Sequence, residues 1–159
     1  LKEVQLIWMT GNSGVAEARK VAESRDSQVE VFAFIDDMVT ACAAARLIVS
    51  RSGASTTAEI AQVGRASILI PYPHATDNHQ EKNARAFEAK EASVVLLDGD
   101  CTGEALGRML HDLLSNEQRL ESMEAAAKTM AQPVAVERIV EHVFNVAFGE
   151  DIEQGQTAR

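Results

Sequence analysis

Hydroxyl and glycine residues cluster in one short segment of the chain, residues 50–63, directly after an apolar run. The segment reads Ser-Arg-Ser-Gly-Ala-Ser-Thr-Thr-Ala-Glu-Ile-Ala-Gln-Val and follows Leu-Ile-Val at 47–49. This pattern predicts a strand, a tight turn and a helix. Such a junction aims unpaired backbone N–H groups and the positive end of the helix dipole at one point, which suits a phosphate or diphosphate group.

The candidate phosphate cradle in this segment consists of small and hydroxyl residues: Ser52, Gly53, Ser55 and Thr56. Glycine lets the backbone approach a ligand closely, and hydroxyls add neutral donors. The spacing of Thr56 and Glu59 is also that of a capping box, in which Glu59 reaches back to the start of the helix. Glu59 could instead accept hydrogen bonds from a ribose. Arg51 either neutralises a phosphate or braces the turn through carboxylates.

A second polar loop, residues 71–80, follows the next apolar run and contains His74-Ala-Thr-Asp-Asn-His79. Its spacing matches no strong zinc signature, so we expect no metal here. His79 and Gln80 begin a predicted helix, where side chains can meet a sugar or a phosphate. Their alternative role is helix initiation, with Asp77 or Asn78 as the cap. The Asp36–Asp37 pair is expected to cap the next helix and not to act in acid-base chemistry.

Five apolar runs predict buried parallel strands that alternate with helices, the pattern of a doubly wound, Rossmann-like α/β fold. The predicted strands are 5–10, 29–34, 47–50, 67–70 and 93–97, and the predicted helices are 15–24, 37–45, 56–63, 79–91, 103–114, 117–130 and 134–148. Ligands of such folds bind beyond the carboxyl ends of the strands. The apolar face of the last helix is expected to pack against the sheet or another domain.

Composition limits the function classes. The chain has 159 residues, a formal net charge of −9 and only 4% aromatic residues, which argues against nucleic acid as a partner. Hydrophobic residues make up 46%, an ordinary globular balance. The two cysteines, Cys42 and Cys101, are expected to be reduced thiols in a cytosolic protein. From the residues alone, the prediction reaches an anion-binding α/β domain.

Three motifs in order closely resemble the MurG family of bacterial UDP-N-acetylglucosamine transferases. They are Phe-Ile-Asp-Asp-Met at 34–38, Leu-Ile-Val-Ser-Arg-Ser-Gly-Ala-Ser-Thr-Thr-Ala-Glu-Ile at 47–60, and Ile-Leu-Ile-Pro-Tyr-Pro-His-Ala-Thr-Asp-Asn-His-Gln-Glu-Lys-Asn-Ala at 68–84. The likeness spans most of residues 5–148. It implies the C-terminal, donor-binding domain of a GT-B glycosyltransferase over residues 1–149. The remaining residues, 150–159, are short and polar and are expected to form a disordered tail.

The resemblance implies a role for most of the candidate residues, with no metal or cofactor. The implied contacts are Ile35 and Met38 at the uracil; Ala54, Ser55 and Thr56 at the diphosphate and sugar; Glu59 at the ribose; and His79 and Gln80 at the N-acetylglucosamine. The sugar would pass in one inverting step to undecaprenyl-diphospho-muramoyl-pentapeptide, which converts lipid I to lipid II in peptidoglycan synthesis. The whole enzyme would be cytoplasmic and peripheral on the inner membrane.

Departures from the family pattern give further expectations. The sequence does not contain the family's acceptor half, which binds the lipid-linked acceptor and the membrane and is expected to supply the general base. It also does not contain the first strand of the donor domain and its glycine-serine loop. We therefore expect a sheet without its central strand, in a piece of a longer chain that is inactive alone. Ala66 and Lys90-Glu91 replace a usual proline and a usual Ala-Gly. The alternatives are a non-catalytic UDP-sugar-binding subunit with a separate acceptor-binding partner, and another UDP-hexosamine GT-B enzyme.

Overall fold

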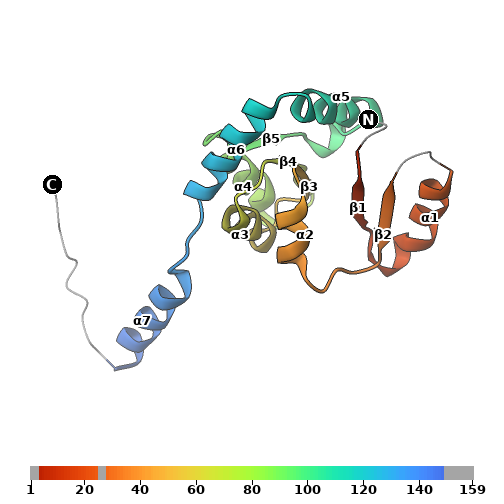
Figure 1. Cartoon of the computed structure of the whole chain (residues 1–159). Helices are drawn as coiled ribbons and strands as arrows, with labels where there is room; N and C mark the ends of the chain where they lie inside the picture. Colours follow the sequence, from red (N-terminus) through yellow and green to blue (C-terminus); the bar gives the residue numbers. More distant parts are fainter. Residues whose placement is uncertain (1–3, 25–27, 149–159) are drawn as a thin grey trace.

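A computed structural model describes residues 4–24 and 28–148, so the tail predicted at 150–159 lies outside the described residues (Figure 1). The strands are β1 (Leu6–Met9), β2 (Val29–Phe32), β3 (Ile48–Ser50), β4 (Ser67–Leu69) and β5 (Ser93–Val95). The helices are α1 (Gly11–Glu23), α2 (Met38–Ala44), α3 (Ala54–Val63), α4 (His79–Glu88), α5 (Gly103–Leu114), α6 (Glu117–Thr129) and α7 (Ala135–Phe148), with short 3₁₀ turns η1 (Thr76–Asn78) and η2 (Asp98–Asp100).

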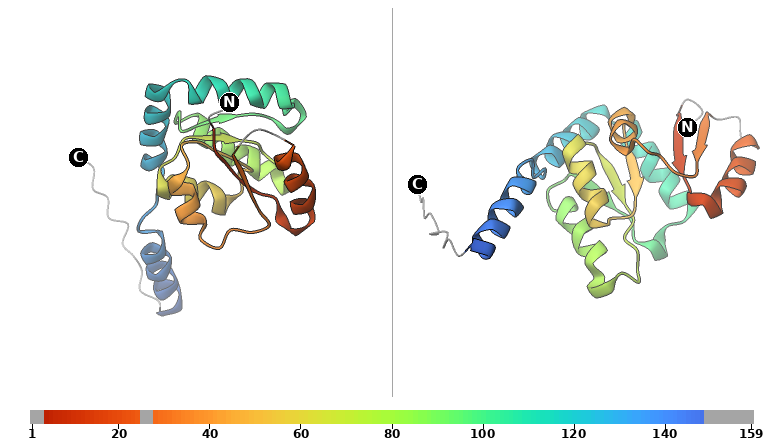
Figure 2. Two further views of the ribbon diagram at one scale, coloured as in Figure 1. Left: turned by 45° about the vertical axis from the view of Figure 1, so that its right-hand side comes forward. Right: turned by 90° about the horizontal axis from the view of Figure 1, so that it is seen from below.

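The five strands are parallel, as predicted, and form two sheets. One sheet pairs β1 with β2, and the other has the order β3-β4-β5. In Figure 1, and again in the right panel of Figure 2, β1 lies between β2 and β3, so it is the strand of its sheet that is nearer to β3. The division agrees with a doubly wound sheet that is short of a central strand.

The three-stranded sheet carries the hydrophobic core. Every residue of β4 is buried, and successive side chains of a strand point to opposite faces. Leu69 accordingly packs with Ile60 and Phe87 of α3 and α4, while Ile68 packs with Leu113 and residues of α6 on the other side. Helices thus cover both faces of this sheet, which fixes the carboxyl ends of β3 and β4 in a rigid frame (Figure 2).

The sequence prediction was wrong about the environment of β1. Its side chains were expected to be buried on both faces, but all four residues are exposed, and Trp8 retains 39% of its accessible surface. The physical reason is that a two-stranded sheet with one flanking helix, α1, has too little apolar material to cover both faces.

Two helices begin earlier than predicted. The first was expected at 15–24 but begins at Gly11, and the third was expected at 56–63 but begins at Ala54. Both starts contain glycine, serine or asparagine, which are poor helix formers, so local propensity favoured a loop there. In the folded chain each helix instead follows its strand almost directly.

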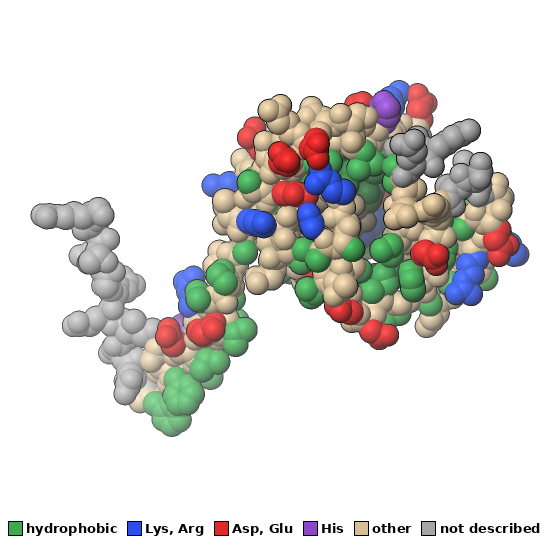
Figure 3. Space-filling model, in the orientation of Figure 1, with side chains coloured by type: hydrophobic (Ala, Val, Ile, Leu, Met, Phe, Trp, Pro, Cys, Tyr) green, Lys and Arg blue, Asp and Glu red, His purple; other side chains and the backbone are tan. Residues whose placement is uncertain are grey.

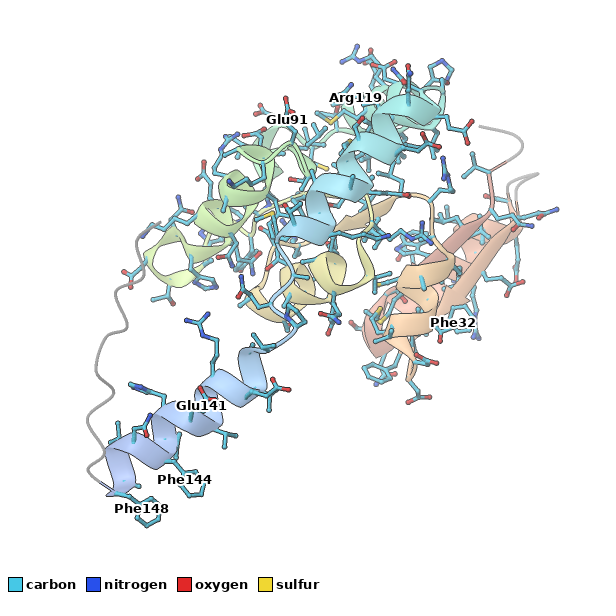
Figure 4. The ribbon with its side chains drawn as sticks, turned by 60° about the vertical axis from the view of Figure 1, so that its left-hand side comes forward. Phe32, Glu91, Arg119, Glu141, Phe144 and Phe148 are labelled. Atoms are coloured by element: carbon cyan, nitrogen blue, oxygen red, sulfur yellow. The ribbon has the colours of Figure 1, made fainter. Side chains whose placement is uncertain are left out.

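The last helix, α7, has no buried residue and extends away from the sheets (Figure 1). Of the two packing partners predicted for its apolar face, the sheet is therefore wrong for the described residues, and another domain stays a prediction. Its apolar side chains are exposed, and Phe144 and Phe148 lie together with ring centroids 5.3 Å apart (Figures 3 and 4). No helix within the described residues combines the length and the hydropathy that crossing a bilayer requires.

Candidate functional site

The turn between β3 and α3 presents the start of a helix without a side-chain cap. Gly53 is the N-cap residue, in an extended conformation, and no side chain caps the helix start. Ala54 and Ser55 are exposed, and Thr56 is the third helical residue. A capping box with Thr56 as its first member is therefore wrong, because the helix begins two residues before it. No side chain therefore occupies the first N–H groups of α3, and the phosphate cradle at this helix start stays a prediction.

Thr57 ties this turn together and was not singled out from the sequence. Its side chain is buried, and its hydroxyl donates to the main-chain oxygens of Gly53 at 3.0 Å and Ala54 at 3.1 Å. Threonine hydroxyls commonly form such bonds to earlier carbonyls of a helix. In the sequence, Thr57 differs from Thr56 only in its spacing from Ile60 and Ala61, which places it on the buried face of the helix. In so short a helix, this spacing was too weak a signal to single it out.

Ser52 joins the β3–α3 turn to α4. Its side chain is 0% exposed, and its hydroxyl donates to the main-chain oxygen of Gln80 at 2.8 Å. The Nδ2 of Asn83 donates to the main-chain oxygen of Ser52 at 3.0 Å. We name these two hydrogen bonds the Ser52 clasp. They bring the cradle of α3 and the first turn of α4 into one site, as expected for neighbouring loops at the carboxyl ends of strands.

Arg51 braces the edge of the site. Its Nη1 lies 2.6 Å from the Asp98 carboxylate and donates to the main-chain oxygens of Ile70 and Pro71 at 3.3 and 3.1 Å. Its guanidinium also lies over the Tyr72 ring, 5.6 Å from the centroid. Of the two roles left open by the sequence, these contacts favour bracing. A pocket of about 400 Å³ adjoins Arg51, lined also by Val49, Ser50, Ile70, Asp98 and Cys101.

The third predicted segment, with Ile35 and Met38, lies between β2 and α2. Both residues are half-buried, and Met38 is the first residue of α2. Asp37 caps α2, as predicted, and accepts hydrogen bonds from the Thr40 hydroxyl at 2.6 Å and the Thr40 N–H at 2.9 Å. These bonds hold the pKa of the Asp37 carboxyl below its usual range, because they stabilise its charged form.

Packing of α2 against α3 connects this third segment to the cradle. Burial raises the pKa of the Cys42 thiol on α2, and the nearby Glu59 carboxylate on α3 raises it further. Glu59 itself is half-buried. The structure therefore brings the cradle and Gln80 together by direct hydrogen bonds, and it relates Met38 to them through the α2–α3 contact.

The loop before α4 has an unusual backbone. Asp77 and Asn78 both have positive φ, 52° and 54°, a region that asparagine and aspartate tolerate best among non-glycine residues. Asn78 occupies the N-cap position of α4, but its side chain donates to Glu81 at 2.7 Å and does not cap the helix. His79 is exposed, and its Nδ1 donates to the main-chain oxygen of Thr76 at 2.7 Å. Across the described residues, no group of three or more His, Cys, Asp or Glu side chains is arranged to hold a metal ion.

The fold is that of a Rossmann-like α/β domain. Its strands are parallel with helices on both faces, and a turn that contains glycine and hydroxyl residues precedes an uncapped helix. Residues 1–139 match the model of the glycosyltransferase family 28 C-terminal domain. The chain belongs to this family, and its fold is that of the C-terminal domain of a GT-B glycosyltransferase.

The chain is similar to proteins named UDP-N-acetylglucosamine--N-acetylmuramyl-(pentapeptide) pyrophosphoryl-undecaprenol N-acetylglucosamine transferase. It is 44% identical to the one from Syntrophotalea carbinolica, covering 93% of this chain and 41% of that protein. It is 40% identical to one from Desulfitobacterium hafniense, covering 92% of this chain and 41% of that protein. The crystal structure of Acinetobacter baumannii MurG superimposes with a TM-score of 0.80 at 30% identity, over 89% of this chain and 42% of that chain. The chain thus spans about two fifths of the length of these relatives.

Proposed function

We propose that residues 1–149 form the donor-binding domain of an inverting glycosyltransferase that uses UDP-N-acetylglucosamine. The acceptor is the lipid-linked muramoyl-pentapeptide named in the relatives, so the reaction converts lipid I to lipid II. The observation that carries this proposal is the uncapped start of α3, with Ala54 and Ser55 exposed beside the first turn of α4. This arrangement suits a diphosphate with a sugar next to it.

Most of the predicted residues take a defined part in the proposed complex. The diphosphate lies at the N–H groups of Ala54 and Ser55, where the Thr56 hydroxyl adds a donor. The Glu59 carboxylate accepts from the ribose hydroxyls, and the uracil edge meets the Ile35 backbone near Met38. Gln80 and His79 face the N-acetylglucosamine. From Met38 through Glu59 and Ser55 to Gln80, the proposed contacts run along a UDP-sugar from base to hexose.

In the reaction, the acceptor hydroxyl attacks the anomeric carbon of N-acetylglucosamine as the bond from that carbon to the diphosphate oxygen breaks. UDP leaves with an additional negative charge. The positive end of the α3 dipole and its free N–H groups stabilise that charge where it develops. The base that takes the proton of the acceptor hydroxyl is expected on an acceptor-binding half, which also meets the membrane on its cytoplasmic face.

A nucleotide titration followed by amide chemical shifts tests the donor site. Addition of UDP is expected to shift the amides of residues 35, 53–59 and 80 together, because one ligand contacts all three segments. Adenosine diphosphate serves as the matched control, since it keeps the diphosphate and replaces uracil. Shifts confined to 53–55 with equal affinity for the two nucleotides would reduce the site to a general phosphate cradle and refute the proposed specificity.

A further inference from the structure

The buried state of Ser52 sets it apart from the rest of the cradle. Ala54 and Ser55 are exposed, whereas the Ser52 side chain is 0% exposed and its hydroxyl hydrogen is used on the main-chain oxygen of Gln80 at 2.8 Å. A serine that contacted a phosphate would need its hydroxyl at the surface of the turn. Ser52 therefore acts within the protein, between the turn and α4.

The second bond of the Ser52 clasp runs in the opposite direction. Asn83 Nδ2 donates to the main-chain oxygen of Ser52 at 3.0 Å, so Ser52 both donates to α4 and accepts from it. Two bonds to residues one helical turn apart fix the rotation of α4 about its axis as well as its distance from the turn. A half-buried Asn83 and a buried Ser52 make these bonds stronger than exposed ones would be.

The carboxamide of Gln80 is oriented by a third bond. Its Oε1 accepts from the backbone N–H of Tyr72 at 3.0 Å. A backbone N–H can only donate, so the oxygen of the carboxamide must face Tyr72 and the NH₂ group must face away from it. Among the hydrogen bonds of the described residues, none uses Nε2 of Gln80, which leaves two N–H donors for a ligand.

We propose that Ser52 and Asn83 are positioning residues whose clasp holds Gln80 as a hydrogen-bond donor, and never an acceptor, toward an oxygen of the donor hexose. This inference rests on the proposed function and deepens it. The clasp sets where the first turn of α4 stands relative to the diphosphate cradle. The Tyr72 N–H sets which end of the Gln80 side chain the sugar meets. Recognition of the sugar is thereby separated from recognition of the diphosphate.

The ratio of the dissociation constants for UDP and UDP-N-acetylglucosamine isolates the contribution of the sugar. Both constants can be measured by calorimetry on this chain. Gln80→Glu keeps an acceptor for the Tyr72 N–H but removes the NH₂ group, so it should lower the ratio about fivefold to tenfold, the effect of losing one hydrogen bond. The new carboxylate also repels the diphosphate, and it repels UDP more because UDP carries about one negative charge more than UDP-N-acetylglucosamine. This effect raises the ratio, so it cannot be the cause of the expected fall.

Ser52→Ala and Asn83→Asp test the clasp. Asn83→Asp places a carboxylate oxygen opposite the main-chain oxygen of Ser52, so that bond is lost with almost no change in shape. Each variant should lower the ratio about threefold or more, a part of the Gln80 effect. Combined with Gln80→Glu, Ser52→Ala should lower the ratio no further, because residues that act through one contact are not additive.

Two control variants separate the loss of the clasp from the loss of a buried hydroxyl and from the addition of a charge. Ser93 is also buried, at 4% exposed, but its hydroxyl has no partner, so Ser93→Ala should leave the ratio unchanged. Asn116 caps α6 with its Oδ1, a bond that Asn116→Asp preserves while adding the same charge as Asn83→Asp.

Three results would overturn the inference. Equal weakening of both ligands by Ser52→Ala would show that the clasp positions the diphosphate cradle and not the sugar contact. A lower melting temperature with an unchanged ratio would make the clasp purely structural. Binding of neither ligand by the unaltered, folded chain would overturn the proposed function, and this inference with it.

Discussion

Glu91 lies in the turn that follows α4 and has a conformation that favours glycine, so its replacement by glycine should stabilise the chain. Its φ is +58°, in the left-handed region. The Glu91 N–H donates to Glu88 O at 2.8 Å and the Ala92 N–H donates to Phe87 O at 3.0 Å, the pair of bonds that defines a Schellman motif. Glycine is the usual residue at this position of the motif because it has no Cβ to clash with the backbone.

The size of the effect follows from two opposing terms. A residue with a Cβ loses about 1–2 kcal/mol in the left-handed region. Glycine in turn loses about 0.5–1 kcal/mol more conformational entropy on folding. The side chain of Glu91 is exposed, so little packing is lost. Glu91→Gly should therefore raise the free energy of unfolding by about 0.5–1 kcal/mol, and the melting temperature by about 1–4 °C for a domain of this size.

Urea unfolding and calorimetry of Glu91→Gly and two control variants test this expectation. Lys90 is adjacent and exposed but has no positive φ, so Lys90→Gly should destabilise the chain. Gly64 ends α3 at φ +70°, and a Cβ there would meet the Lys128 side chain, so Gly64→Ala should destabilise it too. If Glu91→Gly lowers stability as Lys90→Gly does, the strain assigned to Glu91 is absent and the reasoning fails.

Three further predictions concern the site and the elements around it. Glu59→Gln should weaken UDP-sugar binding more than it lowers the melting temperature, and unchanged affinity with a large melting loss would contradict a ribose contact. The Asp37 carboxyl should titrate below its usual range by NMR, so its bonds to Thr40 stabilise the fold at neutral pH and are lost as the pH falls through that lowered pKa; an ordinary midpoint would contradict the cap. Cys42, buried and with a raised pKa, should react with a thiol reagent at pH 8 more slowly than Cys101, and equal rates would show that the packing of α2 against α3 does not shield it.

The sequence predicted most of the fold because its apolar runs are short, rich in Val and Ile, and separated by helical patterns. All five strands lie within their predicted ranges, and the helix predicted at 103–114 has those bounds. The errors fall where local composition and tertiary context disagree. Glycine and serine at the starts of α1 and α3 predicted loops, yet each start follows a strand whose packing holds it in place.

The sequence indicated which residues belong to the candidate site better than it indicated what each of them contacts. The cradle and the capping function of Asp37 follow from local spacing alone. The clasp does not, because Ser52 and Asn83 are separated by 31 positions and nothing local distinguishes Ser52 from Ser55. The bracing role of Arg51 likewise depends on Asp98, which lies 47 residues further along the chain. Residues so far apart in the sequence come into contact only in the folded chain, so these partners could not be identified from the sequence.

The division of the strands into two sheets has a consequence for how the chain melts. Across the described residues, the unit of β1, α1 and β2 makes its extensive contacts within itself, and the β3–β4–β5 layer holds both hydrophobic clusters. Regions with few shared contacts open independently. Amides of the first unit should therefore exchange with deuterium at lower opening energies than those of β4, and heating should produce two overlapping calorimetric peaks in place of one.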